Sequence, residues 1–137
     1  MGWLNATLEL EGDSVDWDKF AGNLLNGLSR RFAESNSAIG HVKLIIEADS
    51  NFVIGNLIEA GEPPSIRRSA GVGSEAKMTL NVRVQMEPDR LEKVALEEIV
   101  KACGNNVTSE VLALKCLRPG YPNPTHRYDR VTPSSKA

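Results

Sequence analysis

The side chains best suited to metal binding or nucleophilic catalysis are few in this sequence and lie far apart. They are His41, His126, Cys103 and Cys116, and no two of them stand at the spacing of a local chelating pair. A Ser-His-Asp or Cys-His arrangement would have to be built almost wholly around His41, because the other histidine lies in a proline-rich C-terminal segment. We therefore predict no metal site and no catalytic residue, and we interpret both cysteines as small buried apolar side chains.

Neither the adjacent carboxylates nor the glycine-rich segments indicate a catalytic or nucleotide-binding site. Glu97 and Glu98 form an acidic pair, but they fall on a helix face crowded with charge, which favours a solvated surface. The sequence has no GxxxxGK[ST] motif, whose backbone amides close around phosphates. Gly71-Val72-Gly73 lacks the third glycine of the dinucleotide fingerprint and leads into a strand, where that motif requires a helix. We expect no cofactor and no specific binding of GTP or ATP by these routes.

One segment does combine the groups that bind anions. Residues 62–75 read EPPSIRRSAGVGSE, with two arginines among serines and glycines. Guanidinium groups, hydroxyls and flexible backbone amides together suit a phosphate or a carboxylate. The alternative interpretation is a solvated loop between two strands, which its arginines keep hydrated. The candidate anion- or ligand-binding residues are Arg67, Arg68, Ser69, Gly71 and Gly73.

Five segments carry strand patterns. Apolar and polar side chains alternate in residues 4–11 and 77–86, which predicts strands with one solvent-exposed face. Residues 39–48 are rich in strand-forming side chains, and an Asp-Ser-Asn hairpin signal joins them to a returning strand at 52–58. The last strand, at 111–117, is apolar on both faces apart from one lysine, so we expect it to be central in a sheet.

Two further segments carry apolar stripes at helical spacing, from Trp17 to Phe32 and from Pro88 to Ala102. Acidic and hydroxyl residues precede the first stripe and proline opens the second, and both are favoured at helix N-termini. The element order β-α-β-β-β-α-β predicts an α+β fold of the ferredoxin-like sandwich type. Two helices would pack on one face of a mostly antiparallel five-stranded sheet. Because an open sheet leaves unpaired strand edges, we expect a homodimer that covers them.

Length and composition place these elements in one domain. The chain has 137 residues, of which 41% are hydrophobic and 25% charged, and its net charge of −2 lacks the basic surplus typical of nucleic-acid-binding proteins. We expect a single α+β domain at residues 1–118, followed at 119–137 by a proline-rich extended tail that joins neither sheet nor helix. With no secretory signal pattern and no apolar run of about 20 residues, the sequence predicts a cytoplasmic protein without a membrane partner.

The end of the sequence carries a family resemblance. The run from Cys116 to Arg127 reads CLRPGYPNPTHR, and it resembles the C-terminal end of some CobW-family members. These are GTP-binding proteins associated with cobalamin synthesis and with metal or corrinoid handling. The run IGHVKL, from Ile39 to Leu44, is similar to a stretch of the same region, as is the segment rich in serine and arginine. The Walker lysine and the CxCC-type metal-binding motif are absent, so the resemblance implies partner recognition without GTP hydrolysis or metal delivery.

The resemblance and the composition of the tail together predict a non-catalytic binding or interaction module that recognises a protein partner. It would be a free-standing relative of a CobW-type C-terminal domain, acting near a corrinoid- or metal-handling system. The alternative is a small enzyme or anion-binding protein that uses the arginine- and glycine-rich segment. Prolines restrict the free tail in advance, so an extended segment docks at modest entropic cost. The candidate docking residues are Arg118, Pro119, Tyr121, His126, Arg127 and Tyr128.

Overall fold

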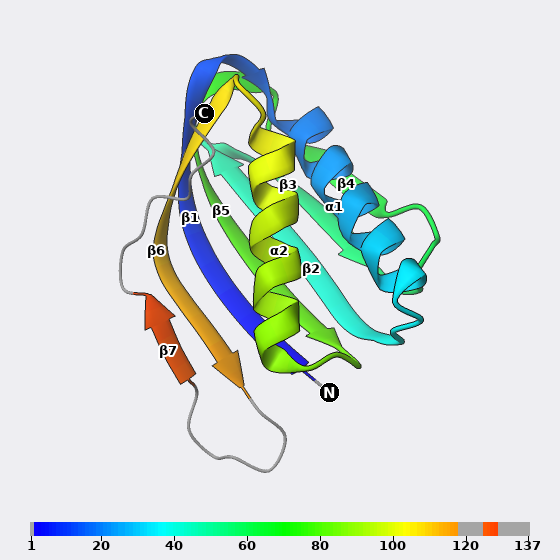
Figure 1. The fold of residues 1–137 in the computed structure, drawn as a ribbon. Coiled ribbons are helices and arrows are strands. Elements are labelled where there is room, and N and C mark those ends of the chain that lie inside the picture. The colour runs from blue at the N-terminus through cyan, green and yellow to red at the C-terminus, as the bar shows by residue number, and fades with distance from the viewer. Residues whose placement is uncertain (1, 118–124, 129–137) are drawn as a thin grey trace.

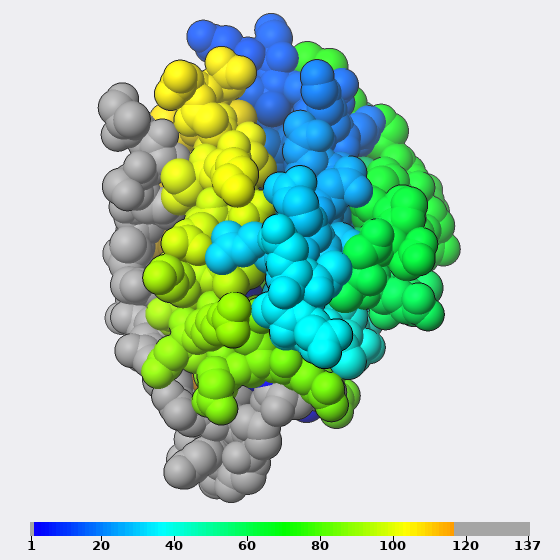
Figure 2. Space-filling view, turned by 45° about the vertical axis from the view of Figure 1, so that its right-hand side comes forward, coloured from blue at the N-terminus to red at the C-terminus, as the bar shows by residue number. Residues whose placement is uncertain are grey.

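Two helices lie side by side on one face of a single seven-stranded sheet (Figures 1 and 2). The structure, a computed structural model, describes residues 2–117 and 125–128. The elements are β1 (Gly2–Asp16), α1 (Trp17–Glu34), β2 (Ile39–Ala48), β3 (Asn51–Leu57), β4 (Ser65–Ser69), β5 (Val72–Val84), α2 (Pro88–Cys103), β6 (Val107–Leu117) and β7 (Thr125–Tyr128). The strand order is β4-β3-β2-β5-β1-β6-β7, and all neighbours are antiparallel. The α+β class and the two helices are confirmed.

The chain crosses the sheet in two interlocked β-α-β units. β1 and β2 run in the same direction with β5 between them, and β5 and β6 run in the same direction with β1 between them. Each helix therefore links two parallel strands across an antiparallel one, and both helices reach the same face. β6, which the sequence predicts to be central, does have a neighbour on each side.

Strand alternation determines which side chains meet the helices. The inward-facing positions of β1, β2 and β5 are apolar and buried, and the apolar stripes of α1 and α2 pack against them. Full burial of one such side chain contributes about 1.5–3 kcal/mol, so this layer is the main source of stability. The largest fully buried side chains include Trp17, Phe32, Leu8, Leu24, Leu28, Leu44 and Leu91.

The contact between the two helices contains a buried charge. Glu98 of α2 is only 2% exposed, and its Oε2 accepts a hydrogen bond of 2.9 Å from Nη1 of Arg31 on α1. Lys101 Nζ lies 3.4 Å from the same oxygen, and Arg31 Nη2 donates to Glu97 Oε1 at 3.0 Å. These carboxylates, Glu97 first and then Glu98, raise the pKa of Arg31. The prediction of a solvated acidic surface is therefore wrong for Glu98, because Gly27 on α1 leaves room for its carboxylate between the helices.

The structure adds two strands to the five that the sequence predicts, and so corrects the expected layout. β4 falls in the segment 62–75; as an edge strand with every residue exposed, it lacks the burial alternation that identifies a strand. β5 begins at Val72 because its first residues pair with the end of β1. β7 pairs with β6, so the expectation that the tail joins no sheet is wrong for residues 125–128. These four residues contain no proline, and their backbone amides are available to a strand ladder.

Both cysteines are buried and free, as predicted, with Cys103 2% and Cys116 3% exposed. Burial raises the pKa of the Cys103 thiol above its ordinary value. In the part of the chain that the structure describes, no three His, Cys, Asp or Glu side chains are grouped to hold a metal ion. Neither α1 nor α2 is long and apolar enough to cross a membrane.

Candidate functional site

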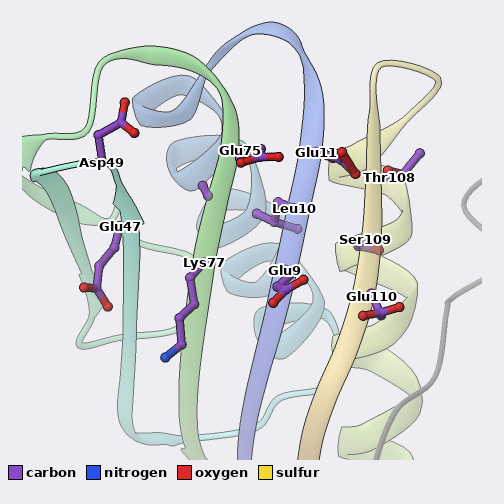
Figure 3. A pocket seen from close by; sticks show the side chains of 11 residues that line it. Glu9, Leu10, Glu11, Glu47, Asp49, Glu75, Lys77, Thr108, Ser109 and Glu110 are labelled. Carbon is purple, nitrogen blue, oxygen red and sulfur yellow. The ribbon is translucent and has the colours of Figure 1, made fainter.

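The face of the sheet opposite the helices is the most distinctive surface of the molecule. Among the described residues no helix or strand covers it, and in Figure 3, which views part of this face, the helices lie behind the sheet. We call it the open face. Strand pairing arranges its side chains in rows that run across the strands. The middle row, from β3 to β6, consists of Ile54, Ile45, Thr79, Thr7 and Ala113.

The middle row is the least polar part of the open face. Its side chains are half-buried, and they present methyl and methylene groups of isoleucine, threonine and alanine. The β-branched side chains of this row have restricted χ1 rotamers, so covering them costs little side-chain entropy.

Carboxylates occupy the open face on one side of the middle row. The first row beyond it carries Glu47, Lys77, Glu9 and Glu110, and the following one reaches Asp49, Glu75 and Glu11. We call these residues the acidic end. They line a hollow of about 520 Å³, whose side chains rise from β2, β5, β1 and β6 (Figure 3). Lys77 is the one cation in this lining.

Cations, amides and an aromatic ring occupy the other side of the middle row. The nearer row has Lys43, Asn81, Asn5 and Lys115, and the outer row has His41, Arg83 and Trp3. We call these residues the basic end. Asn5 Nδ2 donates to Asn81 Oδ1 at 2.6 Å, and the Arg83 guanidinium lies 4.6 Å from the centre of the Trp3 ring. Trp3 remains 41% exposed although it contacts Arg83.

The open face is broad and exposed, and its acidic end is not an enclosed cleft. Most of the carboxylates at the acidic end are exposed, and they stand on four separate elements of the sheet. Small-molecule sites are usually concave pockets that bury most of the ligand, whereas these carboxylates stand in a broad hollow on an exposed sheet. Tryptophan and arginine are, by contrast, among the residue types most enriched where protein interfaces derive their affinity.

The predicted anion-binding residues lie on the β4–β5 hairpin, where several already have contacts within the fold. The Ser69 hydroxyl donates to the carboxylate of Asp18 in the first turn of α1, and the Ala70 amide donates to the other oxygen of that carboxylate at 2.8 Å. The Gly71 carbonyl accepts from the Trp17 amide at 3.0 Å. The hairpin therefore orders the start of α1 through a carboxylate of the chain itself.

The two arginines of this hairpin lie on the edge strand and are exposed. Arg68 has a positive φ of 66° and places its guanidinium 5.3 Å from the centre of the Phe52 ring. Arg67 pairs with Ile54, and Gly73 pairs with Val15 at the far end of β1. The structure brings Arg67 and Arg68 together on β4 but leaves Gly73 on the next strand, and anion binding there stays a prediction.

The tail residues are divided by the limits of the described chain. Arg118, Pro119 and Tyr121 lie outside the described residues. His126, Arg127 and Tyr128 belong to β7, where His126 pairs with Lys115 and Tyr128 with Leu114 of β6. The structure therefore places part of the tail on its own domain as an edge strand.

Sequence patterns alone do not predict the graded charge of the open face, although the sequence contains a signal for it. The outward positions of residues 3–11 and of 41–49 each change from basic or neutral to acidic along the chain, while those of 75–83 change in the opposite order. Because β5 runs antiparallel to its neighbours, all three gradients point the same way in the sheet. Pattern reading gives the face of each side chain, but only strand order and register bring equal charges together.

Comparison of the chain with protein-family models, with curated proteins and with solved structures gave no match. Its function is therefore inferred from its own residues. The features that carry this inference are the open face, its acidic end and its basic end.

Proposed function

We propose that this chain is a non-catalytic interaction module that binds a protein partner through the open face of its sheet. The single observation that carries the proposal is the order of that face, in which an apolar middle row separates an acidic end from a basic one. Complementary charges at a protein interface set orientation and suppress wrong partners, while the apolar centre supplies affinity.

The aromatic contact at the basic end supports this proposal. Trp3 is a large exposed side chain whose ring contacts the Arg83 guanidinium, and this contact favours one orientation of the ring. An ordered aromatic side chain loses little rotamer freedom on binding, which lowers the cost of association. Tryptophan and arginine are also the residues whose truncation most often weakens an interface.

We further propose that the fold is a ferredoxin-like sandwich, formed by β1, α1, β2, β5, α2 and β6 and extended at its edges by β3, β4 and β7. The strand order β2-β5-β1-β6 and the two interlocked β-α-β units support this assignment. The CobW resemblance, and with it a cytoplasmic role near corrinoid or metal handling, belongs to the same proposal. It is supported by the run from Ile39 to Leu44, which contributes His41 and Lys43 to the basic end.

Site-specific photo-crosslinking in cells tests the proposed function. A benzophenone amino acid would replace Thr79 or Ile45 on the open face, or Lys93, which is exposed on α2, as the matched control. After irradiation we expect covalent adducts from the two open-face positions and none from Lys93, and the mass of each adduct identifies the protein captured. Absence of adducts from both open-face positions would overturn the proposal.

A further inference from the structure

We infer that the partner is a second copy of this chain, packed open face to open face so that the acidic end of each protomer lies over the basic end of the other. This inference rests on the proposed function and specifies the partner. Three observations support the inference: the charge complementarity within the open face, the area of that face, and the residues of the sheet edges.

A two-fold axis can be placed on this face in only one way that separates like charges. If the axis runs along the strands, each acidic end meets the acidic end of the other copy, and many carboxylates are brought together. If the axis runs across the strands along the middle row, each strand lies over its own copy in the opposite direction. The acidic rows then face the basic rows in both halves of the interface.

The residues brought together by this second arrangement are complementary. Glu47 and Lys43 stand on either side of Ile45 on β2, so Glu47 of one copy faces Lys43 of the other. In the outer rows of β5, Glu75 faces Arg83 of the second copy, because both flank Thr79 at equal distance along the strand. Each contact occurs twice by symmetry. The twist between aligned sheets displaces the facing residues but keeps the acidic rows over the basic rows.

β1 and β6 follow the same rule. Glu9 faces Asn5 of the second copy, and Glu110 faces Lys115 of the second copy. The middle row, with its methyl groups, meets itself at the centre of the interface. Charged groups thus surround an apolar strip, which is the usual composition of a specific protein interface.

The open face is large enough for a stable dimer. The three inner rows cross five strands and the two outer rows cross three, so strands about 4.8 Å apart and rows about 6.8 Å apart give a surface of roughly 700 Å² per protomer. A standard specific interface buries about 600–1,000 Å² from each partner.

The sheet edges, where the sequence predicts the dimer contact, are less suited to it. β4 has five residues and β7 has four, so edge pairing would form few backbone hydrogen bonds. β4 also carries Arg67 and Arg68, and charged side chains on a short edge strand oppose pairing with another sheet.

Complementary charge reversal in the full-length chain tests the inference. Light scattering at about 50 µM should give twice the 14.9 kDa mass of the chain. Lys43→Glu alone, or Glu47→Lys alone, places like charges at two symmetric contacts and should raise the dissociation constant about tenfold or more. An equimolar mixture of the two variants should restore the dimer, because each reversed residue then faces its opposite. Lys93→Glu on α2 is the control and should leave the mass unchanged.

Several outcomes would contradict the inference. The first is a monomer mass for the wild type, and the second is a dimer mass that both single reversals leave unchanged. The third is a mixture of the two variants that keeps a monomer mass although each variant melts at the wild-type temperature. Photo-crosslinking separates this failure from failure of the proposed function. Adducts at Thr79 that contain a different protein would retain the interaction module and exclude the second copy as its partner, whereas absence of any adduct would remove both.

Discussion

At the scale of single residues, the buried Glu98 shows how one glycine changes the environment of a charge. Without a side chain at Gly27, α2 places a carboxylate between the helices, where Arg31 and Lys101 reach it. A buried ion pair contributes little net stability compared with an apolar pair of the same volume, but removal of one partner leaves an uncompensated charge.

Arg31→Met should therefore destabilise the protein strongly. We expect the free energy of unfolding to fall by about 2–4 kcal/mol, because Lys101 at 3.4 Å compensates Glu98 only in part. Urea denaturation measures the change. The double variant Arg31→Met/Glu98→Leu should recover most of the loss, and a double variant no more stable than Arg31→Met would contradict this account.

The Cys103 thiol should make stability depend on alkaline pH. Its ordinary pKa is 9.0, and burial raises the pKa in the folded state. Below pH 9 the thiol is protonated in both states, so it adds no pH dependence. Above that pH the unfolded thiol loses its proton while the folded one retains it, and the free energy of unfolding falls by up to about 1.4 kcal/mol per pH unit.

Urea denaturation at pH 8, 9 and 10 would compare the wild type with Cys103→Val. The variant lacks the titrating thiol, so its stability should decline less steeply above pH 9. All other residues are common to both proteins, so their effect cancels in the difference. Parallel pH profiles would show that the thiol is not protected from ionisation.

At the scale of elements, the β4–β5 hairpin and the start of α1 depend on each other. Asp18 accepts hydrogen bonds from Ser69 and Ala70, while the Asp16 side chain caps the helix by accepting from the amides of Asp18 and Lys19. One carboxylate thus closes the helix N-terminus and another fixes the hairpin against it.

Asp18→Ala should loosen the hairpin without unfolding the sheet. The Ala70 amide, which is part-buried in this contact, loses its acceptor, and we expect a loss of about 1–2 kcal/mol. Amide hydrogen exchange should accelerate at residues 65–71 and remain slow in β1 and β2. An equal acceleration throughout the chain would show that the contact supports global and not local stability. Asp13→Ala, at an exposed residue in β1, is a matched control that should have little effect.

β7 gives part of the tail a structural role. Deletion of residues 118–137 removes the strand that pairs with β6, and each backbone hydrogen bond lost costs about 1 kcal/mol. The melting temperature should fall. Deletion of 132–137 alone spares β7 and should not change it. If both truncations melt at the wild-type temperature, pairing between β7 and β6 contributes nothing to stability.

At the scale of the whole molecule, the sequence predicts the helices and strands whose patterns depend on neighbouring residues. It does not predict features that depend on the register between strands. Helical stripes and strand alternation place both helices and five strands, because burial on one face imposes those periods. β4 is exposed along its length, so no burial period marks it, and the four residues of β7 stand among prolines. The open face could not be predicted for a related reason. Its charges follow no unusual pattern along the chain, and they form acidic and basic rows only when β5 lies antiparallel between β1 and β2.

The interior position of β1, between β5 and β6, has a consequence for how the chain folds during synthesis. β1 is synthesised before both of its neighbours, which come much later in the chain, with Thr7 pairing with Thr79 and with Ala113. The apolar residues of β1 cannot be buried until β5 and β6 have been synthesised, so folding is dominated by contacts between distant segments. Such topologies fold in milliseconds to seconds. During that delay both edges of β1 are unpaired, and an unpaired strand edge is a template for pairing with another chain.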